Sequence, residues 1–172
     1  MNKNIETKGE TKMLYEGKTY EEYLELVKER GIYLEYVPDK YKTYDLCLEA
    51  VKIEGSSLVY VPDKHRTYEL CLQAVENNKI SANILPLIPN KHRTYELCLK
   101  VVKNKVTNMI TVLNHIPEEH KTYELCLEVV SRIPNNSPVY NVDKAIPKDI
   151  LLELEKNNKF RVMKYKCNPE DE

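Results

Sequence analysis

The segment Arg66-Thr67-Tyr68-Glu69-Leu70-Cys71-Leu72 decides the fold, because the chain contains four near-identical copies of it and two degenerate ones. The Thr position of the six copies falls at residues 19, 43, 67, 94, 122 and 147, with proline in the last. Successive copies are therefore 24, 24, 27, 28 and 25 residues apart. A recurrence of this length is typical of stacked structural repeats. A proline also stands five positions before the Thr of each complete copy, at Pro38, Pro62, Pro89 and Pro117.

Each copy has the pattern of a helix start. Threonine is a favoured N-cap, and the acidic residue two positions later lies in the positively polarised first turn. In the first complete copy the polar residues Asp45, Glu49 and Lys52 fall on one narrow face, and hydrophobic residues fill most of the rest. We therefore predict a helix over Tyr44 to Lys52 that is covered on several sides, as happens when repeats stack on their neighbours.

A second, shorter helix is expected in each repeat. Asn or Gly ends the first helix, as at Gly55, and Pro62 ends the second because proline disfavours helix for the residue before it. The candidate N-caps of these second helices are Ser56 or Ser57, Ser81 and Thr107.

The expected fold is all-α: an α-solenoid of about six stacked helical-hairpin repeats of 24–28 residues, whose hand the sequence leaves open. Residues 14–169 are expected to form this single repeat domain, with degenerate terminal repeats. Residues 1–13 are expected to form a polar N-terminal tail and residues 170–172 an acidic tail.

The motif Val-Pro-x-x-x-[Lys/Arg]-Thr-x-Glu-Leu-Cys-Leu-x-Ala-Val resembles the short α-helical hairpin repeats of a family of unknown function, found in intracellular bacteria and giant viruses. The resemblance covers residues 14–169 and is strongest over 37–130. It weakens at the ends, where Tyr23 and Leu151 replace the cysteine and Val142 replaces the proline. The resemblance implies an interaction module, and it supplies no catalytic residues.

Composition narrows the class of protein. The 172 residues include 26 Lys and Arg and 27 Asp and Glu. This balance argues against a protein whose whole surface binds nucleic acid or anionic lipid. No apolar leader opens the chain and no segment approaches the ~20 apolar residues of a membrane span, so we expect a cytoplasmic protein of its own cell or an invaded host cell. Of 13 Tyr, five follow the Thr positions.

Catalysis and metal binding are not expected. The cysteines at 47, 71, 98 and 126 recur once per repeat, and equivalent positions on stacked helices lie ~8–10 Å apart, too far for a disulfide or a shared metal. We predict that they are small buried hydrophobes, and that Cys167, outside the series, is the most reactive thiol. The histidines at 65, 92, 115 and 120 lack zinc-site spacing, and no Gly-rich phosphate loop is present. We expect no enzyme, cofactor or metal.

The best candidate for a binding surface is a row of basic residues before the Thr caps, with a row of tyrosines beside it. Stacking would align them along one edge, where they could hold an acidic partner or stack on bases. The alternative is that the basic side chains cover the loops and pair with Asp39, Asp63, Glu118 or Glu119. The partner-binding candidates are Lys42, Lys64, His65, Arg66, Lys91, His92, Arg93, His120, Lys121, Tyr44, Tyr68, Tyr95 and Tyr123.

The expected function is therefore non-enzymatic macromolecular binding. The first expectation is a protein-binding effector or inhibitor, for example an antagonist of a host or defence protein, that acts by occupying its target. The alternative is an RNA- or DNA-binding solenoid that uses the Lys/His/Arg-Tyr stripe. Self-association of the chain is a third reading, and no interaction with a membrane is expected.

Overall fold

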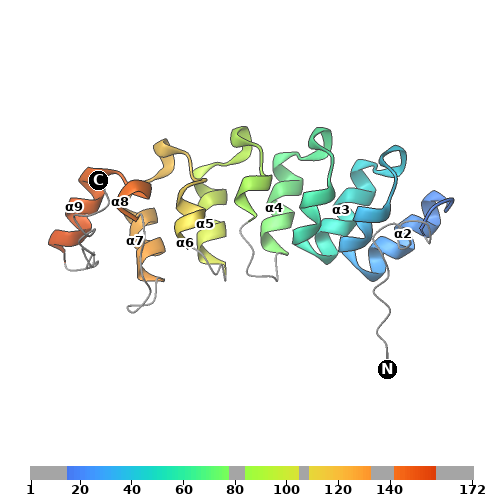
Figure 1. Ribbon diagram of the computed structural model, residues 1–172, viewed down its shortest axis with the longest axis horizontal. Helices are drawn as coiled ribbons and strands as arrows, with labels where there is room; N and C mark the ends of the chain where they lie inside the picture. Colours follow the sequence, from blue (N-terminus) through green and yellow to red (C-terminus); the bar gives the residue numbers. More distant parts are fainter. Residues whose placement is uncertain (1–14, 78–83, 105–108, 133–141, 158–172) are drawn as a thin grey trace, which may run out of the picture.

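The computed structural model describes residues 15–77, 84–104, 109–132 and 142–157. Throughout these ranges the regular elements are helical and no strand occurs. The helices stand side by side along the long axis, from α2 at one end to α9 at the other (Figure 1). The prediction of an all-α helical repeat is confirmed. The expected tails 1–13 and 170–172, with Ser81, Thr107 and Cys167, lie outside the described residues.

One layer consists of the helices that follow the Thr positions, called anchor helices below. In the complete copies the Thr hydroxyl accepts from the backbone N–H three residues later, for example from Leu70 to Thr67 at 3.3 Å. At the first copy Thr19 and Glu22 cap each other reciprocally, and at the last Pro147 provides no side-chain cap. The anchor helices are α2 (Tyr20–Glu29), α3 (Tyr44–Ile53), α4 (Tyr68–Glu76), α5 (Tyr95–Lys103), α7 (Tyr123–Ser131) and α9 (Lys148–Lys156).

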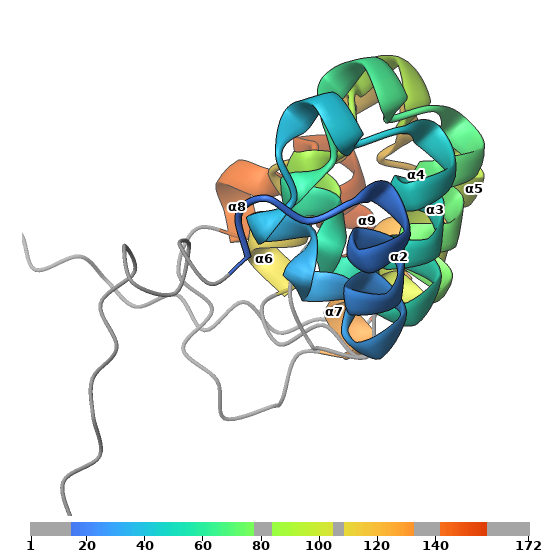
Figure 2. The ribbon, with the colours of Figure 1, turned by 90° about the vertical axis from the view of Figure 1, so that its right-hand side faces the viewer.

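The second layer differs from the expectation of regular helices. Its three N-terminal members are 3₁₀ elements, η1 (Gly31–Tyr36), η3 (Gly55–Tyr60) and η5 (Leu85–Leu87), and α6 (Met109–Leu113) and α8 (Val142–Ala145) are short α-helices. Because Val61-Pro62 ends η3 after six residues, the chain takes the tighter, longer-rising helix that suits short runs. Figure 2 shows α6 and α8 on the opposite side of the molecule from α3 and α4.

The predicted N-cap at Ser56 or Ser57 is wrong. The residue before η3 is Glu54, and no side chain caps that end. Ser57 lies inside the element, fully buried, and its hydroxyl has no hydrogen-bond partner in the described part of the chain. η1 begins at Gly31, which lies close to the Ala50 carbonyl of α3, and η3 begins at Gly55, whose backbone N–H donates to the Asn77 carbonyl at 3.2 Å.

The core lies between the two layers and between successive repeats. In α4 the residues Leu70, Cys71, Ala74 and Val75 are buried, and their equivalents repeat this in the complete copies. Tyr23, which replaces the cysteine in α2, is also fully buried. This arrangement follows from the wide apolar surface of each anchor helix, which packs against the adjacent repeats.

Candidate binding surface

The proline turns form one long edge of the molecule, called the turn edge below. It comprises residues 38–43, 62–67, 89–94 and 117–122, at the top of Figure 1. Each turn has a proline, a three-residue 3₁₀ turn, one basic residue and the capping Thr. The 3₁₀ turns are η2 (Asp39–Tyr41), η4 (Asp63–His65), η6 (Asn90–His92) and η7 (Glu118–His120). All thirteen candidate residues lie on this edge or at the first position of an anchor helix.

The two arginines directly before the Thr caps bind backbone carbonyls. Arg66 donates from Nε to Val61 at 2.9 Å and from Nη1 to Leu87 of the next repeat at 3.2 Å. Arg93 makes the equivalent bonds to Ile88 at 2.8 Å and His115 at 3.1 Å. Both side chains therefore tie adjacent repeats together.

The lysines at the same position are similarly occupied. Lys42 pairs with Asp39 at 3.1 Å, and Lys121 pairs with Glu118. Only 5% of the Lys121 side chain is exposed. The alternative weighed above, in which basic side chains cover the loops and pair with nearby acids, describes these residues well.

The histidines and tyrosines meet across the repeat boundaries. His65, His92 and His120 each approach the tyrosine of the preceding repeat, with ring centroids 6.4 Å apart in the three pairs. These tyrosines, Tyr44, Tyr68 and Tyr95, are half-buried against the core. Tyr123 instead accepts a hydrogen bond from Asn157 of the last repeat at 3.0 Å. The aromatic row therefore contributes to stacking while keeping part of each ring accessible.

The exposed cations of the turn edge are the lysines three positions before the Thr caps. Lys40, Lys64 and Lys91 are exposed, and Lys40 lies 4.7 Å from the Tyr41 ring centroid. In the fourth turn the same position is Glu119, also exposed. The expected continuous stripe thus becomes a short row of lysines that ends before the fourth turn.

A shallow hollow of about 380 Å³ interrupts the turn edge between the second and third complete repeats. Arg66, Lys91 and Arg93 line it together with Asp63 and apolar residues of the 84–89 segment. Sequence reasoning placed the cations on one edge but missed the hollow, whose depth depends on how η5 packs.

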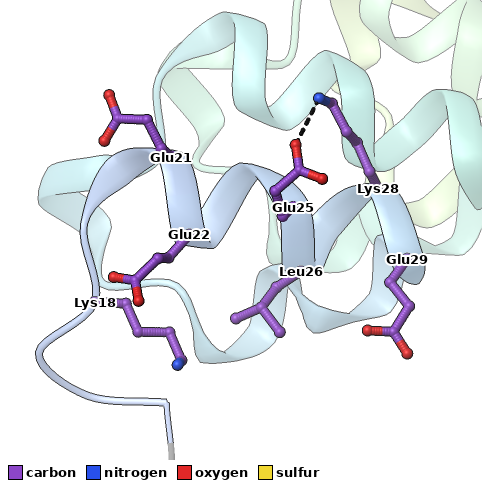
Figure 3. A pocket seen from close by; sticks show the side chains of 7 residues that line it. All are labelled: Lys18, Glu21, Glu22, Glu25, Leu26, Lys28 and Glu29. Carbon is purple, nitrogen blue, oxygen red and sulfur yellow. Dashed lines mark hydrogen bonds and ion pairs between the residues drawn. The ribbon is translucent and has the colours of Figure 1, made fainter.

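A larger hollow of about 680 Å³ lies on the outer face of α2 (Figure 3). It is lined mainly by Glu21, Glu22, Glu25 and Glu29, and the sequence reasoning did not single it out. Two of these acids have structural partners, since Glu22 caps Thr19 and Glu25 binds Lys28 at 2.8 Å. This is the solvated face of the first anchor helix.

The four cysteines that recur once per repeat are buried and have low reactivity. Cys47, Cys71, Cys98 and Cys126 are free thiols in the interior. Burial raises the pKa of each to about 11, so thiolate is scarce at neutral pH. No cluster of three or more potential metal ligands occurs within the residues the structure describes. None of the described helices is long and apolar enough to cross a membrane.

Comparison with known proteins places part of this chain beside one family. A family described as "Domain of unknown function (DUF4116)" matches residues 21–66 and 43–93. The matched stretches overlap, together span less than half of the chain and contain the first two complete copies of the motif. No curated protein and no solved structure matches the chain.

Proposed function

We propose that the chain is a non-enzymatic module that binds another protein and acts by occupying it, as an effector or inhibitor does. The observation that carries this proposal is the turn edge, where successive repeats present an exposed lysine beside a half-buried Tyr–His pair. Tyrosines are enriched at protein interfaces and are frequent hot spots, and charged residues belong to the polar rim around them. We also propose that the chain is related to the short helical repeats of unknown function in intracellular bacteria and giant viruses.

A protein partner fits this edge better than a nucleic acid does. A polynucleotide needs several cations along its phosphates. Here the charges of Lys42, Arg66 and Lys121 are paired with acids of the chain itself. Exposed Glu69 and Glu96 lie at the starts of the neighbouring anchor helices, where they would repel phosphates.

The test is affinity capture of the tagged chain from cell lysate, with and without nuclease, followed by mass spectrometry and titration with the purified partner. A stoichiometric protein that resists nuclease and is lost on Lys64→Glu plus Lys91→Glu supports the proposal. The matched control is Lys103→Glu plus Lys156→Glu, which changes the charge equally at exposed sites at the C-terminal ends of α5 and α9, away from the turn edge. Capture that requires RNA, or equal binding by both double variants, contradicts it.

A further inference from the structure

The third turn of the turn edge differs from the other three in one charge. The cation before the capping Thr has an acidic residue three positions earlier in three turns, and the two form an ion pair: Asp39 with Lys42, Asp63 with Arg66 and Glu118 with Lys121. In the third turn that position is Asn90. Over the described ranges no carboxylate pairs with Arg93.

Arg66 and Arg93 are otherwise matched bond for bond. Each donates from Nε to the carbonyl at the end of its own second-layer element and from Nη1 to the carbonyl before the next turn. The third turn has therefore kept the structural role of the arginine and lost the anion that neutralises it. Arg93 adds one long contact, from Nη2 to Pro86 at 3.5 Å, which brings no charge.

The unneutralised charge faces the hollow of about 380 Å³. Exposed Lys91 lines the same hollow, as does Arg66, whose charge Asp63 already compensates at 3.0 Å. The lining therefore carries an excess of positive charge beside an apolar wall of Pro86, Leu87 and Ile88. Burial lowers the pKa of Arg93; the Cys98 thiol opposes this shift, and no carboxylate does.

We propose that this hollow, called the Arg93 hollow below, binds an acidic segment of a partner protein, with one carboxylate of the segment taking the place of the missing turn acid between Arg93 and Lys91. An adjacent apolar side chain of the segment packs on Pro86 and Leu87. This inference rests on the proposed function and names the chemistry of its partner.

A protein carboxylate suits the Arg93 hollow better than a nucleic acid. The charge excess does not continue into the next turn, where the acid position is Glu118 and Glu119 takes the place of the lysine. Asp63 also lines the hollow, with 89% of its side chain exposed, and would oppose a run of phosphates. One carboxylate can bind Arg93 and avoid Asp63, whereas a phosphate backbone that extends along the edge meets the acids on both sides.

The test uses fluorescence anisotropy of the full chain with a labelled peptide in which Glu alternates with Leu and Gly. A peptide with Gln in place of Glu and a single-stranded oligouridylate are the comparison probes. The Glu peptide should bind and the Gln peptide should not. Asn90→Asp, which restores the acid of the other turns, should weaken binding about fivefold or more, the equivalent of ~1 kcal/mol.

The reciprocal variant Asp63→Asn removes the acid from the same hollow and should tighten binding of the Glu peptide. Lys40→Gln removes an exposed cation that does not line the hollow and serves as the control. Equal binding by the wild type and Asn90→Asp, or preferential binding of oligouridylate, overturns the inference. If a captured partner still binds Asn90→Asp normally but not Lys64→Glu plus Lys91→Glu, the proposed function stands and the inference fails.

Discussion

The Arg66 side chain joins two repeats by donating from Nη1 to the Leu87 carbonyl at 3.2 Å while its Nε holds the Val61 carbonyl at 2.9 Å. Val61 ends the second-layer element of its own repeat, and Leu87 belongs to the next one. A single side chain thus fixes the spacing between successive turns. Arg93 repeats the arrangement on Ile88 and His115, which makes it part of the architecture.

Arg66→Ala should therefore destabilise the fold by about 1–3 kcal/mol, because two part-buried carbonyls lose their donor. Arg66→Lys should cost less, since Lys42 and Lys121 occupy the same position in other turns. Urea denaturation followed by circular dichroism measures both. The matched control is Lys64→Ala, an exposed neighbour whose loss should change the free energy of unfolding by no more than about 0.5 kcal/mol. Equal effects of Arg66→Ala and Lys64→Ala would refute the structural role.

A second prediction concerns the close approach of Gly31 to the next repeat. A Cβ at this position would overlap the Ala50 carbonyl oxygen and lie 2.8 Å from Ser57 Oγ. Because the first of these contacts is backbone, it cannot move aside easily. Gly31→Ala should destabilise the chain by at least the ~1–3 kcal/mol of an overpacked core.

Gly17→Ala is the comparison for Gly31→Ala. Gly17 has φ 78° and nothing within 4 Å of its added Cβ, so only backbone strain of about 1 kcal/mol is expected. Both variants are read by thermal unfolding. If Gly17→Ala costs as much as Gly31→Ala, the two repeats do not approach as closely as the structure shows.

The repeat itself was predictable because it rests on local chemistry. Thr caps, the apolar positions after them and the prolines before them recur at fixed offsets, and the anchor helix predicted over Tyr44 to Lys52 is observed over Tyr44–Ile53. Capping and helix periodicity act within one or two turns of helix, so a single sequence contains all the information they need.

The second-layer elements were less predictable because their form depends on neighbours. Ser57 looks like an N-cap in isolation, yet it is buried inside η3. Likewise, a row of basic residues in the sequence does not reveal that Arg66 reaches a carbonyl 21 residues away. The signal that could have been read is the change from Asp63 to Asn90 between equivalent positions.

A third prediction follows from the buried cysteines. The pKa of Cys98 is about 11 in the folded chain, against an ordinary value of 9.0. Above pH 9 the unfolded chain ionises first, so the stabilising effect of burial is complete below that pH and is lost as pH rises through 11. The free energy of unfolding should therefore fall with alkaline pH. Cys98→Ala should make the fall shallower; an unchanged slope would contradict the assignment.

The same burial predicts thiol reactivity. In a Cys167→Ser background, the four remaining thiols should react with a disulfide reagent only as fast as the chain unfolds. Addition of urea should expose all four together, since they occupy equivalent places in one core. Rapid reaction of one thiol in the native chain would show that its repeat opens separately.

The last prediction separates stability from binding at the third turn. Asn90→Asp should give Arg93 the ion pair that Arg66 already has, and this should raise the free energy of unfolding by about 0.2–1 kcal/mol at low salt. The gain should shrink at high salt, because the acid in this turn is largely exposed, as Asp63 is. Asp63→Asn should show the opposite sign. Urea denaturation at two salt concentrations measures both variants.

The comparison of stability with binding distinguishes a binding site from a purely structural feature. Asn90→Asp should make the chain more stable and at the same time weaken its binding of acidic peptides. A variant that loses stability and binding together would show that Asn90 is required for the shape of the turn, and the missing acid would then have no functional meaning.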